Sequence, residues 1–332
     1  MGTRLTAARQ AQDTATLLAG ISRGEHFAIA RAITAIENQT AVGCELGLAV
    51  RSMRGKCRTL GVTGPPGAGK SSMINALMGE LLLRYKRIGV LTVDPSSPVS
   101  GGAVLGDRVR MAAYSANPGV FIRSLAARGH LGGVTRTTRS VIDLLAAGGM
   151  DLVIVETVGT GQSEVEVAQL TEVKLVVCAP GLGDEMQAIK AGILEIADLL
   201  VVNKSDLPDA DQTTAHLKAM LHHRGRDERR RALQVSSVKR DGLAELADAI
   251  DAYFAELSDT GPESEGKGAY SRSMLADDLA ELVAASVRDD PDPRIDAVTA
   301  QVSAGAMSSR DAMMAVIRVL AERDDATVAA LD

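Results

Sequence analysis

The residues with the clearest chemical meaning form a glycine-rich segment, GPPGAGKS, at residues 64–71. It satisfies the pattern G-x-x-x-x-G-K-[ST], in which backbone N–H groups and the start of a helix surround phosphate groups. In this pattern Lys70 reaches the β- and γ-phosphates, and the hydroxyl of Ser71 binds Mg²⁺. The strand-like TLGVT precedes the segment and the helical SSMINALMGELL follows it. The predicted phosphate-binding residues are Gly64, Pro65, Pro66, Gly67, Ala68, Gly69, Lys70, Ser71 and Ser72.

A second segment, NKSD at residues 203–206, predicts which base accompanies the phosphates. Guanine presents N–H donors at its ring nitrogen and its 2-amino group, and the Asp206 carboxylate can accept both. Adenine has neither donor on that edge and leaves the carboxylate unpaired, which is unfavourable. Asn203 is expected to brace the neighbouring loops, and the Lys204 stem to cover the base. The residues at the place where small GTPases bring a backbone N–H to the guanine carbonyl are Ser236, Ser237 and Val238. These segments predict binding of GTP and GDP rather than ATP.

Acidic residues at strand ends predict the ligands of a divalent cation. The run DLVIVETVG places Glu156 at the end of a strand and resembles the GTPase pattern D-x-x-G, with Gly159 positioned to sense the γ-phosphate. A second strand ends at Asp94, and Asp107 follows in a loop rich in Gly, Ser and Pro. Two acids that flank such a loop indicate a mobile Mg²⁺-sensing segment. Turn formation or helix capping is the alternative for both acids.

The group that usually positions the attacking water is missing from its expected place. A glutamine would directly follow Gly159, but Thr160 stands there and Gln162 lies further on. We therefore expect slow intrinsic GTP hydrolysis that a partner accelerates.

The elements that must position these residues alternate along the chain. Apolar runs typical of strands buried on both faces are followed by helical stretches. This pattern predicts an α/β fold, a P-loop NTPase with a doubly wound, mostly parallel sheet flanked by helices. The predicted strands cover residues 59–63, 88–93, 152–156, 175–179, 199–203 and 233–236. Residues 13–40 have helical spacing, and Gly20 and Gly24 are expected to divide them into two helices.

These patterns divide the chain into four regions. Residues 1–57 are an N-terminal helical extension, 58–257 the nucleotide-binding domain, 258–271 a polar, Gly-rich linker and 272–332 a C-terminal helical arm. In the arm, residues 274–287 and 311–320 are expected to be helical, and Ser308 with Asp311 resembles a capping box. A short helical tail cannot bury its apolar face alone, so it must pack on the main domain or on another chain. The basic run 224–231 is interpreted as a solvated loop or helix end rather than an anion site.

Composition narrows the classes of protein. Of 332 residues, 46% are apolar, too many for a disordered chain. A formal net charge of −6 gives no reason to expect nucleic acid or an anionic membrane as partner. No run of about 18 or more apolar residues predicts a membrane span. Three scattered cysteines, Cys44, Cys57 and Cys178, suit a reducing compartment, so we expect a cytoplasmic protein.

Together with the text between the motifs, these residues resemble the MeaB/ArgK family. Its members are the G-protein chaperones of methylmalonyl-CoA mutase, within the metallochaperone group of P-loop GTPases. The segments that carry the resemblance are GPPGAGKSS, LTVDPSSPVSGGAVLGDRVRM, FIRSLAARGHLGGVTRTTR, IVETVGTGQSEVEVA, PGLGDEMQAIKAGILEIADLLVVNKSD and VSSVKRDGL. They cover most of residues 13–257 and match between the motifs as well as within them.

The resemblance implies a homodimer that assists an adenosylcobalamin-dependent methylmalonyl-CoA mutase. Such proteins use GTP to gate delivery of the cofactor from a cobalamin adenosyltransferase and ejection of damaged cobalamin. The Mg²⁺ ligands it implies are Ser71, Asp94, Asp107 and Glu156. The C-terminal helices resemble the family's dimerisation arm.

The resemblance also implies a further switch at residues 183–190. In family members a glutamine and a lysine of that switch move toward the nucleotide when the mutase docks, and Gln187 and Lys190 are the matching positions. They would supply the charge stabilisation that the rest of the sequence lacks. An exposed helix residue is the alternative for Lys190. The resulting catalytic candidates are Lys70, Glu156, Gln187 and Lys190.

Other functions stay open beside this one. A nickel-delivering metallochaperone GTPase would commonly carry His-rich tracts or paired cysteine ligands, but of five histidines only His222 and His223 are adjacent. A P-loop kinase linked to arginine/ornithine transport would favour ATP, which the guanine signature argues against. A nucleotide-dependent switch with negligible turnover differs only in rate. The client could also be an isobutyryl-CoA or ethylmalonyl-CoA mutase.

Overall fold

Two compact units make up the chain, Met1–Glu263 and Ser264–Asp332. The computed structural model describes residues 2–38, 40–53, 55–95, 112–114, 116–127, 133–157, 170–181, 197–223, 232–259 and 292–329. Among the helices of these residues, none has the length and apolar content needed to cross a membrane.

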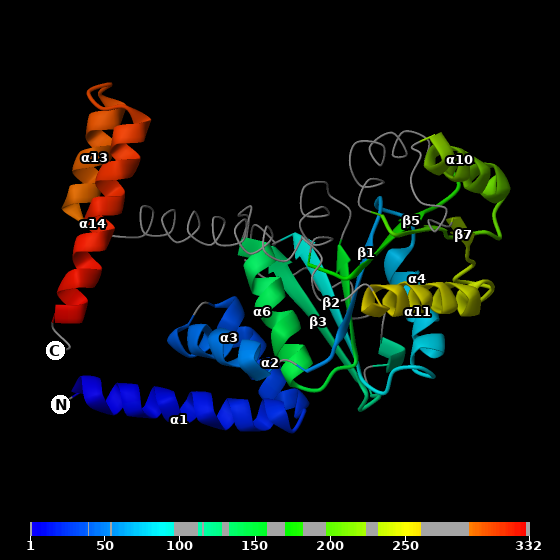
Figure 1. Ribbon diagram of the computed structural model, residues 1–332, viewed down its shortest axis with the longest axis horizontal. Coiled ribbons are helices and arrows are strands. Elements are labelled where there is room, and N and C mark those ends of the chain that lie inside the picture. Colours follow the sequence, from blue (N-terminus) through cyan, green and yellow to red (C-terminus); the bar gives the residue numbers. More distant parts are fainter. Residues whose placement is uncertain are drawn as a thin grey trace. The chain divides into compact units, whose positions relative to one another are not determined.

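The first unit is built on a seven-stranded sheet in which all paired strands are parallel. Its strands are β1 (Arg58–Thr63), β2 (Ile88–Pro95), β3 (Val120–Ala127), β4 (Leu152–Thr157), β5 (Val173–Cys178), β6 (Leu199–Val202) and β7 (Ala232–Gln234). Their order is β3-β2-β4-β1-β5-β6-β7 (Figure 1). The chain moves to one side of β1 first and to the other side later, so the sheet is doubly wound, as predicted.

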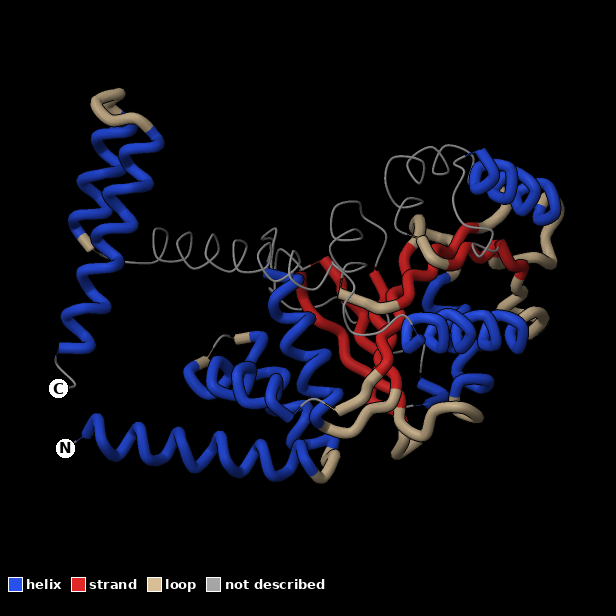
Figure 2. Tube along the Cα trace, viewed as in Figure 1, coloured by secondary structure: helices blue, strands red, loops and turns tan. Residues whose placement is uncertain are grey.

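Helices cover both faces of this sheet (Figure 2). One face carries α4 (Lys70–Leu81) and α11 (Leu243–Asp259), whose apolar side chains form the main core with β1, β4 and β5. The other face carries α6 (Gly133–Ala147) and α10 (Ala210–His223). Three N-terminal helices pack together and against α6, namely α1 (Gly2–Ser22), α2 (His26–Glu37) and α3 (Ala41–Met53). A short 3₁₀ helix covers Ala112–Tyr114.

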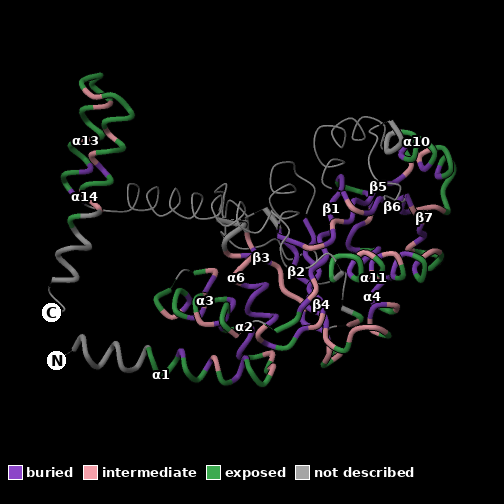
Figure 3. Tube along the Cα trace, viewed as in Figure 1, coloured by how far each residue is buried: buried purple, intermediate pink, exposed green. Residues whose placement is uncertain are grey.

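The central strands are apolar along their length because both faces of the sheet are covered. All six residues of β4 are buried, and so are five of the six residues of β1 (Figure 3). This is the burial expected for a parallel sheet between two helical layers. The fully buried side chains of this core are mostly Ile, Leu, Val and Met, which suits the scarcity of aromatic residues.

The N-terminal helices follow the predicted periodicity, with one correction. α2 buries Ala28, Ile29 and three further residues at spacings of one, three or four. Gly24, with φ +68°, lies between α1 and α2, as predicted. Gly20 instead lies inside α1, so it does not divide the two helices. It faces Ala28 of α2 so closely that a Cβ at Gly20 would lie 2.5 Å from the Ala28 Cβ. Its small size therefore serves helix packing rather than a break.

Strand β3 was absent from the predicted set. It is the strand at one edge of the sheet and pairs with β2 alone among the described strands. Its sequence, VFIRSLAA, contains Arg123 and Ser124 in the middle, so it lacks the continuous apolar run by which its neighbours were identified.

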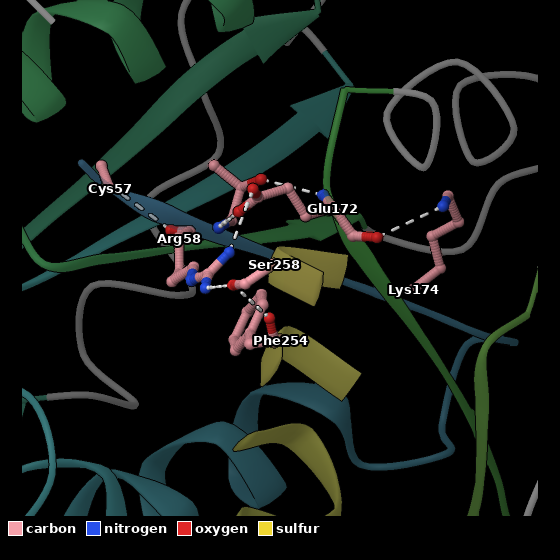
Figure 4. Close-up of polar contacts among 7 residues, drawn as sticks. Cys57, Arg58, Glu172, Lys174, Phe254 and Ser258 are labelled. Carbon is pink, nitrogen blue, oxygen red and sulfur yellow. Dashed lines mark hydrogen bonds and ion pairs between the residues drawn. The ribbon is translucent and has the colours of Figure 1, made fainter. Parts of the chain in front are cut away.

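A polar cluster ties α11 to the N-terminal edge of the sheet (Figure 4). The Arg58 guanidinium lies over the Phe254 ring, 5.3 Å from its centroid, and 3.6 Å from a carboxylate oxygen of Glu172. Arg58 also donates a hydrogen bond to Ser258. Because Ser258 belongs to α11, the predicted linker 258–271 is wrong in its first two residues, and residues 260–271 lie outside the described ranges.

The second unit contains α13 (Pro293–Ser303) and α14 (Ser309–Ala329). The Asp292 side chain accepts a hydrogen bond from the Arg294 N–H and caps α13. The predicted capping contact before α14 is confirmed, since the Asp311 N–H donates to Ser308 Oγ at 3.1 Å. Helix 311–320 lies within α14, whereas the predicted helix 274–287 falls outside the described residues.

Candidate functional site

The glycine-rich segment forms the loop between β1 and α4, at the carboxyl edge of the sheet. Gly64, Gly67 and Gly69 all have positive φ, at +141°, +76° and +86°. A Cβ at Gly64 would lie 2.1 Å from the Val177 carbonyl oxygen of β5, so only glycine fits there. This edge, beside the strand at which the winding reverses, is where doubly wound proteins bind ligands.

The two reactive side chains of the loop are both buried. Lys70 Nζ donates to the carbonyl oxygens of Gly64 and Pro65 at 2.7 Å and 3.1 Å, so its ammonium group lies within the loop. Ser71 Oγ donates to Glu156 Oε1 at 2.7 Å. Glu156 is the penultimate residue of β4 and is 4% exposed. A hydroxyl and a carboxylate placed together at a phosphate-binding helix provide the oxygen ligands that Mg²⁺ prefers, so this pair fits the predicted ion.

Asn203 joins the phosphate loop to the segment after β7. Its Nδ2 donates to the carbonyl oxygens of Ala68 and Gly69 at 3.0 Å and 3.2 Å. Its Oδ1 accepts from the Ser237 hydroxyl at 2.7 Å. Asn203 is 1% exposed, and through these bonds it connects the phosphate loop, the NKSD segment and the segment after β7.

Lys204 also contacts the phosphate loop. Its backbone has φ +59°, and its Nζ donates to the Gly67 carbonyl oxygen at 2.7 Å. The contact of the Lys204 stem with the base stays a prediction, whereas the structure shows the end of the side chain bonded to the loop. That bond draws the NKSD segment against the loop.

Asp206 carries the charge that was predicted to select guanine. Its Oδ1 accepts from the Ser236 hydroxyl at 2.5 Å, and Ser236 Oγ accepts in turn from the Lys239 N–H at 3.1 Å. The pKa of Asp206 is held below its ordinary value of 3.8, chiefly by the hydrogen bond from Ser236. A hydrogen bond from the Asp206 backbone N–H and the positive charges of Lys239 and Lys204 lower it further. The carboxylate is thus ionised at neutral pH and can accept hydrogen bonds. Lys239 was not among the predicted site residues, although it lies next to Val238, whose side chain is exposed.

Several predicted site residues cannot be placed in the same way. The backbone of Asp94 lies in β2 and pairs with Ala126 of β3. Asp107, Gly159, Gln187 and Lys190 lie outside the described residues. Within the described ranges, no group of three or more His, Cys, Asp or Glu could hold a metal ion.

Comparison with known proteins identifies relatives over most of the chain. The family model described as methylmalonyl-CoA mutase-associated GTPase MeaB matches residues 29–292. A probable GTPase of Mycobacterium tuberculosis is 39% identical over 268 residues, which is 77% of this chain and 80% of that protein. The mouse mitochondrial methylmalonic aciduria type A homolog is 33% identical over 314 residues, 88% of this chain and 76% of its own.

Other relatives match over a shorter part of their length. A putative GTPase of Pyrococcus abyssi is 44% identical over 205 residues, which is 62% of this chain and 63% of that protein. Among solved structures, one titled as an LAO/AO transport system kinase matches with a TM-score of 0.66 and 29% identity, covering 92% of this chain and 97% of its own.

Proposed function

The chain belongs to the MeaB family of methylmalonyl-CoA mutase-associated GTPases, and on that basis we propose that it is a GTP-hydrolysing chaperone of a cobalamin-dependent mutase. In this function, bound GTP gates the loading of adenosylcobalamin onto methylmalonyl-CoA mutase and protects or reactivates that enzyme. The chain acts as a homodimer, and the adenosylcobalamin whose loading it gates comes from a cobalamin adenosyltransferase.

The observation that carries the nucleotide part is the bonding of Asn203 to both the phosphate loop and Ser237. It fixes the distance between the place for phosphates and the place for the base. The ionised Asp206 carboxylate then faces a base at a set separation from the phosphates. A nucleotide with the two donors of guanine satisfies that carboxylate, whereas adenine leaves it unpaired.

Hydrolysis places different demands on the residues of the phosphate loop. Lys70 exchanges its two loop carbonyls for the β- and γ-phosphates of GTP, and its charge balances the charge that develops on the phosphates. Ser71 and Glu156 would hold Mg²⁺, with Asp94 and Asp107 as further ligands. When bound, the ion neutralises charge on the β- and γ-phosphates.

The partner part rests on the family and on the missing water-positioning glutamine. A docked mutase brings Gln187 and Lys190 toward the nucleotide and so accelerates a slow reaction. The C-terminal arm supports the dimer, since Met313 and Ile317 of α14 are 59% and 48% exposed and stand one helical turn apart.

Turnover measurements test this proposal directly. The purified chain is incubated with Mg²⁺ and GTP, alone and with adenosylcobalamin-dependent methylmalonyl-CoA mutase, and phosphate release is followed. We expect slow release alone and a clear rise with the mutase. If the mutase leaves the rate of phosphate release unchanged, at mutase concentrations shown to bind the chain, the proposal that the mutase stimulates GTP hydrolysis is contradicted.

A further inference from the structure

We propose that edge strand β3 couples α2 of the N-terminal extension to the nucleotide site, with Thr92 as the positioning residue between them. This inference deepens the proposed function and rests on the nucleotide site described there. Its basis is that consecutive residues of a strand point to opposite faces of the sheet. In β3 these are Arg123 and Ser124, and each is bonded to a different part of the molecule.

On one face, Arg123 holds the last turn of α2. Its Nη2 lies 2.5 Å from Glu37 Oε2 and 3.2 Å from Thr34 Oγ1. The Glu37 side chain is only 14% exposed and that of Arg123 31%, so the ion pair is shielded from solvent on the glutamate side. The Arg123 Nε is buried and has no acceptor among the described residues, whereas its Nη2 is bonded to two side chains of α2. These bonds tie the last turn of α2 to the middle of β3.

On the other face, Ser124 begins a row of polar residues that leads to the phosphate loop. Thr92 Oγ1 of β2 donates to Ser124 Oγ at 2.8 Å. Thr92 is 1% exposed and pairs in register with Ser124 on one side and with Glu156 of β4 on the other. In-register residues of neighbouring parallel strands stand on the same face, so Thr92 lies between Ser124 and Glu156.

The row ends at the residues proposed to hold Mg²⁺. Glu156 accepts from Ser71 at the first turn of α4. The members of the row that lie deepest, Thr92, Glu156 and Ser71, are all less than a tenth exposed. Because a close-packed interior transmits displacement, a shift of β3 relative to β2 changes the space beside the Glu156 carboxylate.

Coupling of this kind is reciprocal. If the position of β3 affects how Glu156 and Ser71 receive the nucleotide, then binding of the nucleotide must affect β3 and α2 by the same free energy. Nucleotide with Mg²⁺ should therefore slow amide hydrogen exchange in the last turn of α2, residues 34–37. This effect requires both the Thr92–Ser124 bond and the Arg123–Glu37 pair.

Hydrogen exchange of the full chain, with and without Mg²⁺ and a non-hydrolysable GTP analogue, tests the proposal. Thr92→Val keeps the shape of the side chain and removes the hydroxyl that donates to Ser124. The matched control is Thr59→Val, since Thr59 is also a strand threonine with 1% exposure. Its hydroxyl accepts from the Glu172 N–H at 2.9 Å, at the end of β1 opposite the phosphate loop.

We expect the analogue to slow exchange at residues 34–37 in the parent and in Thr59→Val, and to leave it unchanged in Thr92→Val. Thr92→Ser should restore the slowing. Ser124→Ala removes the same hydrogen bond and serves if Thr92→Val does not fold. Binding of the analogue with no change at residues 34–37 of the parent overturns the coupling, as does slowing that persists in both Thr92→Val and Ser124→Ala. Failure of the analogue to bind the parent contradicts the proposed function instead.

Discussion

The substitution Gly69→Ala tests how strongly the phosphate loop and the NKSD segment are held together by Asn203. At Gly69, φ is +86°, and a Cβ would lie 2.6 Å from Asn203 Nδ2. At Gly67, φ is +76°, and a Cβ would meet no protein atom within 4 Å. Both Gly→Ala changes carry the cost of a left-handed backbone, about 1–2 kcal/mol. Only the change at Gly69 also displaces Asn203.

The difference between the two variants follows from the contacts of Asn203. Its Nδ2 donates to two carbonyl oxygens of the loop, at 3.0 Å and 3.2 Å. A neutral hydrogen bond contributes about 0.5–1.5 kcal/mol to stability, so losing both costs about 1–3 kcal/mol. We therefore expect Gly69→Ala to lower the free energy of unfolding by about 1–3 kcal/mol more than Gly67→Ala does.

Urea unfolding of the nucleotide-free chain measures this difference. Asn203→Ala, made alone and with Gly69→Ala, completes the test, because both changes remove the same hydrogen bonds. The two effects should then be non-additive, and the second change should cost little beyond backbone strain. Equal losses for Gly67→Ala and Gly69→Ala, or additive effects in the double variant, would refute the role given to Asn203.

Four further outcomes are expected. Lys70→Ala should abolish tight GTP binding in calorimetry, because it removes the ammonium group proposed to contact the phosphates, and parental affinity of the variant would contradict the phosphate-binding role of Lys70. The preference for GDP over inosine diphosphate, which lacks the 2-amino group, should stay constant from about pH 7 to about pH 5. The reason is that the pKa of Asp206 lies below 3.8, so the carboxylate is lost only at lower pH, and a midpoint near pH 6 would exclude it as the acceptor. A thiol reagent should modify the exposed Cys44 and spare Cys178, whose burial raises its pKa to about 12; rapid labelling of Cys178, read by mass spectrometry, would contradict the buried position. Lys190→Ala should blunt stimulation of GTP turnover by the mutase while sparing nucleotide binding, and full stimulation of that variant argues against a switch at this position.

The elements around the phosphate loop could be predicted because their signals are local. The run LVIVET is buried at every position, and a parallel strand buried on both faces can be predicted from its own apolar run, without knowledge of the strands beside it. The loop itself combines glycines at positive φ with the start of a helix, and the sequence pattern G-x-x-x-x-G-K-[ST] predicts both features. These features depend on neighbours within a few residues.

Elements that depend on distant partners were harder to predict. β3 is a strand because β2 pairs with it, and its middle residues Arg123 and Ser124 interrupt the apolar run. Gly20 resembles a helix break in sequence, yet its lack of a side chain allows α2 to pack against α1. In both cases the deciding contact comes from another element.

The site shows the same division. The sequence nominates Asn203, Lys204 and Asp206 by type and spacing. It does not show that Asn203 bonds to loop carbonyls 134 and 135 residues away, or that the Lys204 ammonium holds the Gly67 carbonyl oxygen. Lys239 enters the site through its N–H bond to Ser236, and a backbone donor leaves no mark in the pattern of side chains.

The most direct test of guanine selection is calorimetric titration with non-hydrolysable analogues of GTP and ATP in the presence of Mg²⁺. We predict that the parent chain binds the GTP analogue at least about tenfold more tightly than the ATP analogue, and that Asp206→Asn narrows this ratio and improves binding of a xanthine analogue. Equal affinity for the two analogues in the parent, or a ratio that Asp206→Asn leaves unchanged, would contradict selection of guanine by Asp206.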